Sequence, residues 1–169
     1  MDVQQANEFC FGIELAKKPM SPPIIIDEIN DRYRRFFVVR DDLLPGGTKQ
    51  RACIPLLEHY LTLGYDHFYY ASPFAGFAQV ALAYSCMMMN LDCHIFCEND
   101  PTQHIPYAKH QFTMLAESYG AKITMVRTLA EAEFKANEAA ELNLASIQIP
   151  LGFNCDVFKI ALEIELRKQ

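Results

Sequence analysis

The sequence lacks features that would place it in several large functional classes. It has no block of basic residues, and its formal net charge is −6 at pH 7 over 169 residues. An acidic protein repels phosphates, so we expect no nucleic-acid partner. No apolar run is long enough to cross a bilayer, and the first residues lack the basic and apolar regions of a signal peptide. We therefore expect a cytoplasmic protein that does not enter a membrane.

A disulfide framework is also missing. The six cysteines, at positions 10, 53, 86, 93, 97 and 155, are scattered among apolar residues. Buried free thiols in a reducing compartment are the simplest interpretation. Cys93, His94 and Cys97 are close in sequence. We expect no metal site there, because one strand cannot turn all three side chains to the same face.

The most informative stretch runs from Arg40 to Arg51 and reads RDDLLPGGTKQR. The apolar residues 36–39 before it predict a strand, and the helix formers after it predict a helix. Pro45 and the two glycines that follow allow a sharp turn and a close approach of the backbone to a ligand.

The end of this turn places two residues at the start of the predicted helix. Thr48 is predicted to be the N-cap. Lys49 would then occupy the first helical position, beside free N–H groups and the positive end of the helix dipole. A neutral amine is favoured over a cation there, which suits a lysine that forms a Schiff base.

After Lys49, strand and helix patterns alternate, which predicts βαβ units and a parallel sheet. Thr128 is predicted to cap one helix, and the methionines at 87–89 are predicted to lie in the core. Strands are expected at 66–71, 93–97, 122–126 and 145–149, and helices at 50–63, 75–89, 107–119, 129–141 and 156–168. The predicted fold class is α/β: a three-layer open parallel sheet of about four strands with helices on both faces. We divide the chain into an N-terminal arm, 1–35, with a short helix near 6–17, and one α/β domain, 36–169.

The turn from Arg40 to Arg51 resembles the active-site lysine segment of fold-type II pyridoxal-phosphate (PLP) enzymes, the tryptophan synthase β-like superfamily. It is most similar to the branch of 1-aminocyclopropane-1-carboxylate deaminase and D-cysteine desulfhydrase, where Arg-Glu-Asp precedes Gly-Gly-Asn-Lys-x-Arg. Three later segments also resemble the family in order: 70–79 (YASPFAGFAQ), 120–126 (GAKITMV) and 149–154 (IPLGFN). The resemblance implies that Lys49 is the catalytic Schiff-base lysine, that residues 36–169 are like the family's small domain, and that PLP is the cofactor.

The segment 70–79 departs from the family pattern. The asparagine that normally contacts the PLP ring hydroxyl is replaced by Ala75 or Gly76, which have no side chain to do so. Backbone N–H groups at the start of the following helix can still bind an anion. The residues that the resemblance implies for cofactor binding are Lys49, Ser72, Ala75, Gly76 and Phe77, and those for substrate binding are Tyr70, Ser72 and Gln79.

The chain is also short, since members of the family have roughly twice this length. Their glycine-rich phosphate loop lies beyond the point where this sequence stops, and Gly46-Gly47 is the only glycine pair here. Without such a loop the phosphate has no nest of backbone donors. We therefore expect a homo-oligomer or a partner chain, and weak PLP binding by the chain alone.

Three functions follow from these observations. The first is a PLP-dependent lyase or deaminase of small amino acids, weak or inactive alone. The second is a non-catalytic relative that uses the same fold for binding or assembly. The third is a small module that binds a phosphate ligand at the Gly46-Gly47 turn. His104 and His110 are further candidates for an acid or base, or for helix capping.

Overall fold

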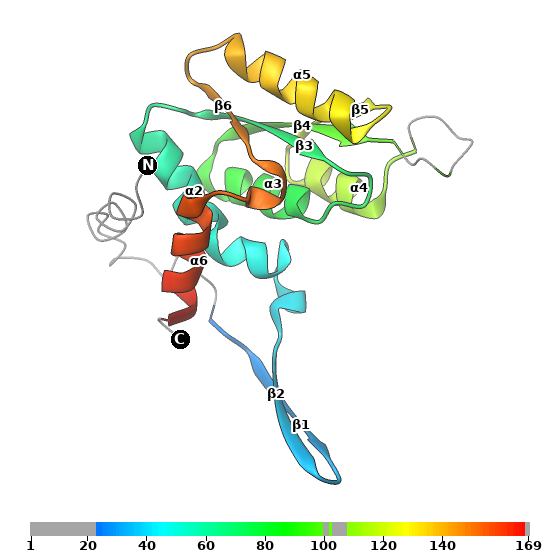
Figure 1. Cartoon of the computed structure of the whole chain (residues 1–169), viewed down its shortest axis with the longest axis vertical. Helices are drawn as coiled ribbons and strands as arrows, with labels where there is room; N and C mark the ends of the chain where they lie inside the picture. The colour runs from blue at the N-terminus through cyan, green and yellow to red at the C-terminus, as the bar shows by residue number, and fades with distance from the viewer. Residues whose placement is uncertain (1–22, 100–101, 103–107, 168–169) are drawn as a thin grey trace.

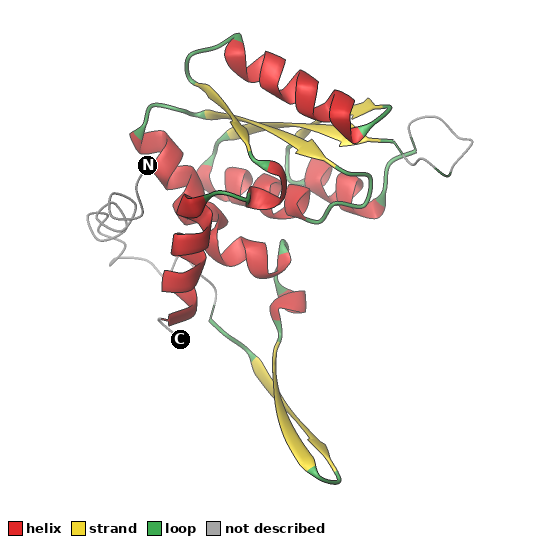
Figure 2. Ribbon diagram, in the orientation of Figure 1, coloured by secondary structure: helices red, strands yellow, loops and turns green. Residues whose placement is uncertain are grey.

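Strands and helices alternate along most of the chain in a computed structural model that describes residues 23–99, 102 and 108–167. Figures 1 and 2 show a layered body with a two-stranded hairpin that projects from it. The elements are β1 (Ile26–Asp31), β2 (Arg34–Val39), η1 (Asp41–Leu43), η2 (Gly47–Lys49), α2 (Gln50–Thr62), β3 (His67–Ser72), α3 (Ala78–Met89), β4 (Asp92–Glu98), α4 (Gln111–Ser118), β5 (Lys122–Val126), α5 (Leu129–Glu141), β6 (Ser146–Ile149), η3 (Leu151–Phe153) and α6 (Asp156–Arg167).

A four-stranded parallel sheet in the order β5-β4-β3-β6 forms the centre of the body. Strand β3 lies inside the sheet, where Tyr70 is opposite Ile95 of β4 and Ile149 of β6. Apolar residues occupy both faces of β3 and β4, as expected for a sheet covered on both sides. The predicted α/β fold with a parallel sheet of four strands is confirmed.

Helices cover both faces of this sheet, which gives three layers. Helix α5 lies along one face, and α3 and α4 lie along the other, with α2 packed against α3 and α6 (Figure 1). The larger core, on the side of α3, contains residues such as Leu56, Leu82 and Ile95, all fully buried. A smaller core under α5 contains Phe96 and Val126.

The ends of the helices follow the local sequence. Thr128 is the N-cap of α5 as predicted: its Oγ1 accepts a hydrogen bond from the Glu131 N–H at 3.1 Å. The Glu131 carboxylate accepts in turn from the N–H of Arg127 at 2.9 Å, which satisfies a second free donor. Gly64 and Gly120, just beyond α2 and α4, have φ values of +91° and +92°, which favour glycine.

The predicted strand at 36–39 forms, but it does not belong to the central sheet. It is part of β2, which pairs antiparallel with β1 in a separate hairpin. The division that we placed after residue 35 falls inside β2. An apolar run of four residues is typical of a buried strand, so the sequence alone does not indicate that all of β2 is exposed.

The methionines at 87–89 differ in their exposure. The prediction that the methionines at 87–89 lie in the core is wrong for two of them, since Met87 and Met88 are exposed at the end of α3. Met89, the last residue of α3, is half-buried and packs against the larger core, so only part of this run agrees with the prediction. The predicted helix at 6–17, His104 and the predicted helix start at 107 lie outside the described residues. Within the described chain, no helix is long and apolar enough to cross a membrane.

Candidate functional site

The turn that carries Lys49 packs closely on helix α3. A Cβ built on Gly46 would lie 2.3 Å from Cβ and 2.4 Å from Cα of Ala81, so only glycine fits at this position. Gly47 has φ +60°, and a Cβ there would lie 3.0 Å from Cε1 of Phe77. The two glycines therefore let the backbone before Lys49 lie directly against the first turns of α3.

A cavity of about 320 Å³ lies between this turn and the start of α3. Its position is at the carboxyl end of β3, where ligands of open α/β sheets are usually bound. Its volume is at the small end of the range for ligand pockets. The lining residues are Asp41, Asp42, Gly46, Gly47, Thr48, Lys49 and Phe77.

Asp41 is held in the wall of this cavity by Arg51. The guanidinium of Arg51 donates to Oδ1 of Asp41 from Nε at 3.0 Å and from Nη2 at 2.5 Å. The side chain of Arg51 is only 1% exposed, so its charge needs this partner. The hydrogen bonds from Arg51, and secondarily one from Thr48, hold the pKa of Asp41 below its ordinary value.

The prediction that Thr48 caps helix α2 is wrong. Thr48 lies inside the short 3-10 turn η2, and α2 begins after Lys49 without a side-chain cap. The Thr48 side chain interacts with Asp41 instead. A cap would need the Thr48 hydroxyl oxygen to accept from a backbone N–H of α2, whereas here the hydroxyl donates to the Asp41 carboxylate, a strong acceptor.

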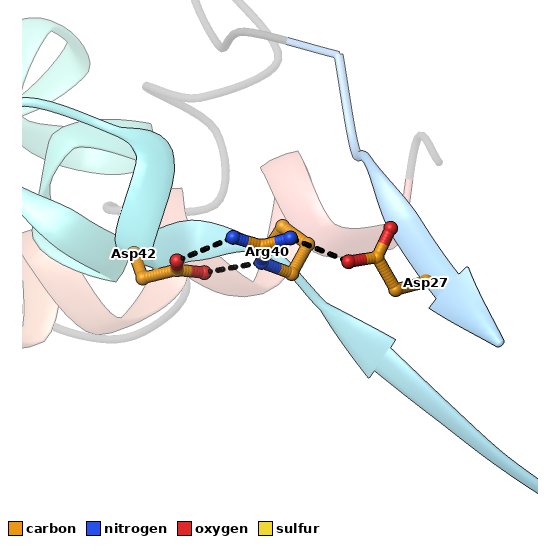
Figure 3. Close-up of polar contacts among 3 residues, drawn as sticks. All are labelled: Asp27, Arg40 and Asp42. Carbon is orange, nitrogen blue, oxygen red and sulfur yellow. Dashed lines mark hydrogen bonds and ion pairs between the residues drawn. The ribbon is translucent and has the colours of Figure 1, made fainter. Parts of the chain in front are cut away.

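Asp42, on the same wall, is paired with Arg40. Figure 3 shows Arg40 between the carboxylates of Asp42 and Asp27. Asp42 lies 2.9 Å from both Nε and Nη2 of Arg40, and Asp27 lies 2.5 Å from Nη1. The hydrogen bonds from Arg40 lower the pKa of Asp42. Because Asp27 belongs to β1, this ion-pair group connects the base of the hairpin to the cavity wall.

The predicted cofactor residues after β3 are only partly brought to the cavity. Phe77 lines it together with Lys49, so these two predicted residues do come together. Ala75 is exposed and Gly76 half-buried on the same turn, but neither is among the lining residues. A Cβ on Gly76 would lie 2.6 Å from Oγ of Ser72, so this turn folds tightly over Ser72.

The three residues predicted to bind substrate are buried, and each makes a hydrogen bond within the fold. Ser72 donates to the carbonyl of Pro73 at 3.0 Å, and Gln79 donates to the carbonyl of Gly76 at 2.8 Å. The hydroxyl of Tyr70 accepts from the N–H of Gly152 at 3.1 Å, and burial raises the pKa of Tyr70 to about 12. None of the three lines the cavity, and their assignment to substrate stays a prediction.

A group of aromatic rings beside the cavity was not predicted. The rings of Phe77 and Phe112 have centroids 4.7 Å apart, and the ring of His110 lies 5.2 Å from Phe74. His110 also caps α4, because its Nδ1 accepts from the N–H of Phe112 at 3.2 Å. The sequence places His110 and Phe112 at the start of α4, but their contacts with Phe74 and Phe77 depend on the tertiary fold.

The cysteine and histidine of β4 do not form a metal site with neighbouring groups. Cys93 is buried, and Nε2 of His94 lies 2.8 Å from Oγ1 of Thr124. Over the described residues, no group of three His, Cys, Asp or Glu side chains is placed to hold a metal ion.

Comparison with family models and with curated proteins finds no match to the sequence. Among solved structures, the chain is similar to an O-acetylserine dependent cystathionine beta-synthase from Helicobacter pylori, with a TM-score of 0.64 and 18% identity over 88% of this chain and 51% of that one. A hydrogen sulfide-producing enzyme from Fusobacterium nucleatum is similar with a TM-score of 0.57 and 19% identity, over 79% and 45%. A pyridoxal 5'-phosphate-dependent aspartate racemase has a TM-score of 0.64 and 17% identity, over 100% and 51%. The chain thus spans about half the length of these structures and has the fold of that half.

Proposed function

We propose that this chain is a shortened relative of PLP-dependent lyases or deaminases of small amino acids, with Lys49 in the Schiff-base position and little or no turnover alone. The observation that carries this proposal is the place of Lys49. It lines a cavity at the carboxyl end of β3, in a chain with the fold of half of a PLP-dependent enzyme. The deaminase branch rests on the match of residues 40–51 to the family motif.

Two of the residues that line the cavity, Lys49 and Phe77, suit PLP. Lys49 offers an amine, and Phe77 offers an aromatic side chain against which a flat ring could pack. When bound, PLP supplies an electron sink for chemistry at the α-carbon of an amino acid.

Two other lining residues, Asp41 and Asp42, do not suit PLP. The phosphate is a dianion, and the cavity wall carries Asp41 and Asp42, whose charges are already balanced by arginines. Ala75 or Gly76 stands where the family has an asparagine for the ring hydroxyl. Losing a hydrogen bond to a charged group costs on the order of 1.5–3 kcal/mol, and a missing phosphate nest removes several such bonds. We therefore assign no catalytic step to the chain alone.

Covalent trapping tests the role of Lys49. The purified chain is mixed with PLP, the absorbance near visible wavelengths is recorded, the adduct is reduced with borohydride, and the modified lysine is identified by mass spectrometry. We expect weak but selective modification of Lys49, lost in Lys49→Ala and retained in Lys122→Ala, at the opposite end of the sheet. Equal modification of all exposed lysines would contradict the proposal.

The two alternatives predict different results. A phosphate-binding module at Gly46-Gly47 would bind phosphate ligands with an affinity that Lys49→Ala leaves unchanged, and the two aspartates in the cavity wall argue against it. A non-catalytic assembly protein would show no adduct at all. The exposure of the hairpin β1–β2 supports an assembly role, and such a role is compatible with descent from a PLP-dependent enzyme.

A further inference from the structure

A second cavity, of about 240 Å³, lies at the other end of the sheet from Lys49. It is lined by the first residues of the strands β3, β4 and β5, and it shares no lining residue with the cavity beside Lys49. Ligands of open α/β sheets usually bind at the carboxyl ends of the strands, so this cavity is separate from the usual site. Its own residues therefore decide what it binds.

The cavity lies on the face of the sheet that carries helix α5. Tyr69 packs with Phe96 in the smaller core under α5. His67 and His94 are each two residues away from these along their strands, so they share the same face. Helix α5 packs mainly on β3, β4 and β6. It therefore does not close the side of the cavity that Lys122 of β5 forms.

Two half-buried rings form one wall of this cavity. Tyr69 lies opposite His94 in the register of β3 and β4, with ring centroids 5.8 Å apart. The His94 ring stacks on Phe96 at 4.3 Å, and its Nε2 lies 2.8 Å from Oγ1 of Thr124, which holds its orientation. Burial, and then the charge of Lys122, lower the pKa of His94 to about 4, so the ring is uncharged at neutral pH. The wall is thus a flat, uncharged surface on which an aromatic group can pack.

Two opposite charges stand on the rim of the cavity, Lys122 and Asp92, and both are exposed. Lys122 pairs with His94 in the register, and Asp92 lies two residues before His94, so the two Cα atoms are roughly 8 Å apart on one face. Within residues 23–99, 102 and 108–167, neither side chain forms an ion pair, with the other or with any further group. A cation and an anion therefore stand beside the same aromatic wall.

The balance of these charges distinguishes between classes of ligand. His67 is paired with Asp66, with Nδ1 2.5 Å from Oδ1, so it adds no net positive charge to the rim. A phosphate or another multiply charged anion would be attracted by Lys122 but repelled by Asp92. A zwitterion is favoured instead, because it carries a charge opposite to each.

We propose that this cavity binds an aromatic α-amino acid. The carboxylate of the ligand pairs with Nζ of Lys122, and its ammonium pairs with the carboxylate of Asp92. Its ring packs against Tyr69 and His94. The cavity is smaller than the pockets of drug-sized ligands, which suits a molecule of the size of one amino acid. This inference does not depend on PLP or on Lys49, so it can fail while the proposed function stands.

Titration with L-phenylalanine, followed by the amide signals in NMR spectra, tests the proposal with the full chain in the absence of PLP. We expect saturable shifts that are largest at residues 67–69, 92–94 and 120–122. The dissociation constant should lie in the millimolar range, which is usual for so small a ligand. Shifts centred on residues 41–49 would place the ligand beside Lys49 and overturn the proposal. The absence of saturable shifts up to the solubility limit would also overturn it.

Three analogues separate the parts of the ligand. Phenylpropanoate lacks the ammonium, phenylethylamine lacks the carboxylate, and L-alanine lacks the ring. Each should bind at least about fivefold more weakly than L-phenylalanine, because each loses one of the three contacts. Equal binding of phenylpropanoate, or tighter binding of inorganic phosphate, would indicate an anion site and overturn the proposal. Equal binding of L-alanine would show that the aromatic wall takes no part, which also contradicts it.

Substitutions at the two exposed charges test the pairing of each end of the ligand. Asp92→Asn and Lys122→Met should each weaken binding of L-phenylalanine at least about fivefold. Lys122→Met should not weaken binding of phenylethylamine, which has no carboxylate, and Asp92→Asn should not weaken binding of phenylpropanoate, which has no ammonium. Lys159→Met, which removes an exposed lysine from helix α6, is the matched control and should bind like the wild type. Circular dichroism shows whether each variant keeps the fold. Wild-type affinity for L-phenylalanine in either Asp92→Asn or Lys122→Met would overturn the proposal.

Discussion

Arg51 and Asp41 form a nearly buried ion pair that joins the start of helix α2 to the turn η1. Two nitrogens of the guanidinium donate to one carboxylate oxygen, and the arginine is almost fully removed from water. Both segments belong to the frame of the cavity around Lys49. The position of that lysine therefore depends on a charge pair that is not itself chemically reactive.

Removing one member of this pair should be costly. Arg51→Met leaves the Asp41 carboxylate largely buried without its counter-ion, and we expect a loss of about 3–5 kcal/mol in the free energy of unfolding. Urea denaturation measures it. Arg167→Ala, which breaks an exposed pair with Glu163, should cost less than about 1 kcal/mol. Similar losses in the two variants would contradict the role given to Arg51.

Gly46→Ala should destabilise the chain through a steric clash. Gly46 has φ −111°, which any residue can adopt, so its backbone angles carry no penalty. The added Cβ would meet the backbone of Ala81, and we expect a loss of about 1–3 kcal/mol from overpacking. Borohydride trapping should also show less PLP on Lys49. Leu43→Ala on the exposed side of the same turn should change stability by less than about 0.5 kcal/mol.

Stability should fall in mildly acidic solution because of His94. Burial, and then the charge of Lys122, lower the pKa of His94 from 6.5 to about 4 in the folded chain. A group with a lowered folded pKa contributes stability that is complete above its unfolded pKa and is lost as the pH falls through the folded value. We therefore expect a decline between about pH 6.5 and pH 4.

His94→Gln keeps a side-chain amide near Thr124 but cannot titrate in this range. Thermal unfolding of this variant across the same pH window should show a flatter decline than in the wild type. Identical slopes in wild type and His94→Gln would show that another group carries the effect.

The sequence predicts the central fold well because its strands and helices have separate, local signals. Apolar strands such as 122–126, a Thr128 cap and terminal glycines at 64 and 120 are each readable from a few residues. The strands are expected to run parallel because a helix connects each strand to the next one along the chain. These are the parts of the structure that agree with expectation.

The site is less predictable, because it depends on contacts between distant segments. Thr48 is a good capping residue by type, yet a carboxylate seven residues earlier takes its side chain. Ser72 and Gln79 are polar residues near a strand end, yet the turn at Gly76 closes over them. The run at 36–39 is apolar like a core strand, and only its antiparallel partner and its exposure identify it as a projecting hairpin.

Turnover is the most direct test of the central claim, which is that Lys49 is in place without the groups that hold and orient PLP. Release of ammonia and of sulfide from small amino acids is measured with the purified chain at high PLP, beside Lys49→Ala. A PLP enzyme needs its cofactor held within a fraction of an ångström, so we predict no release above that of the variant. Tight PLP binding with turnover that Lys49→Ala abolishes would contradict the claim and establish a complete enzyme.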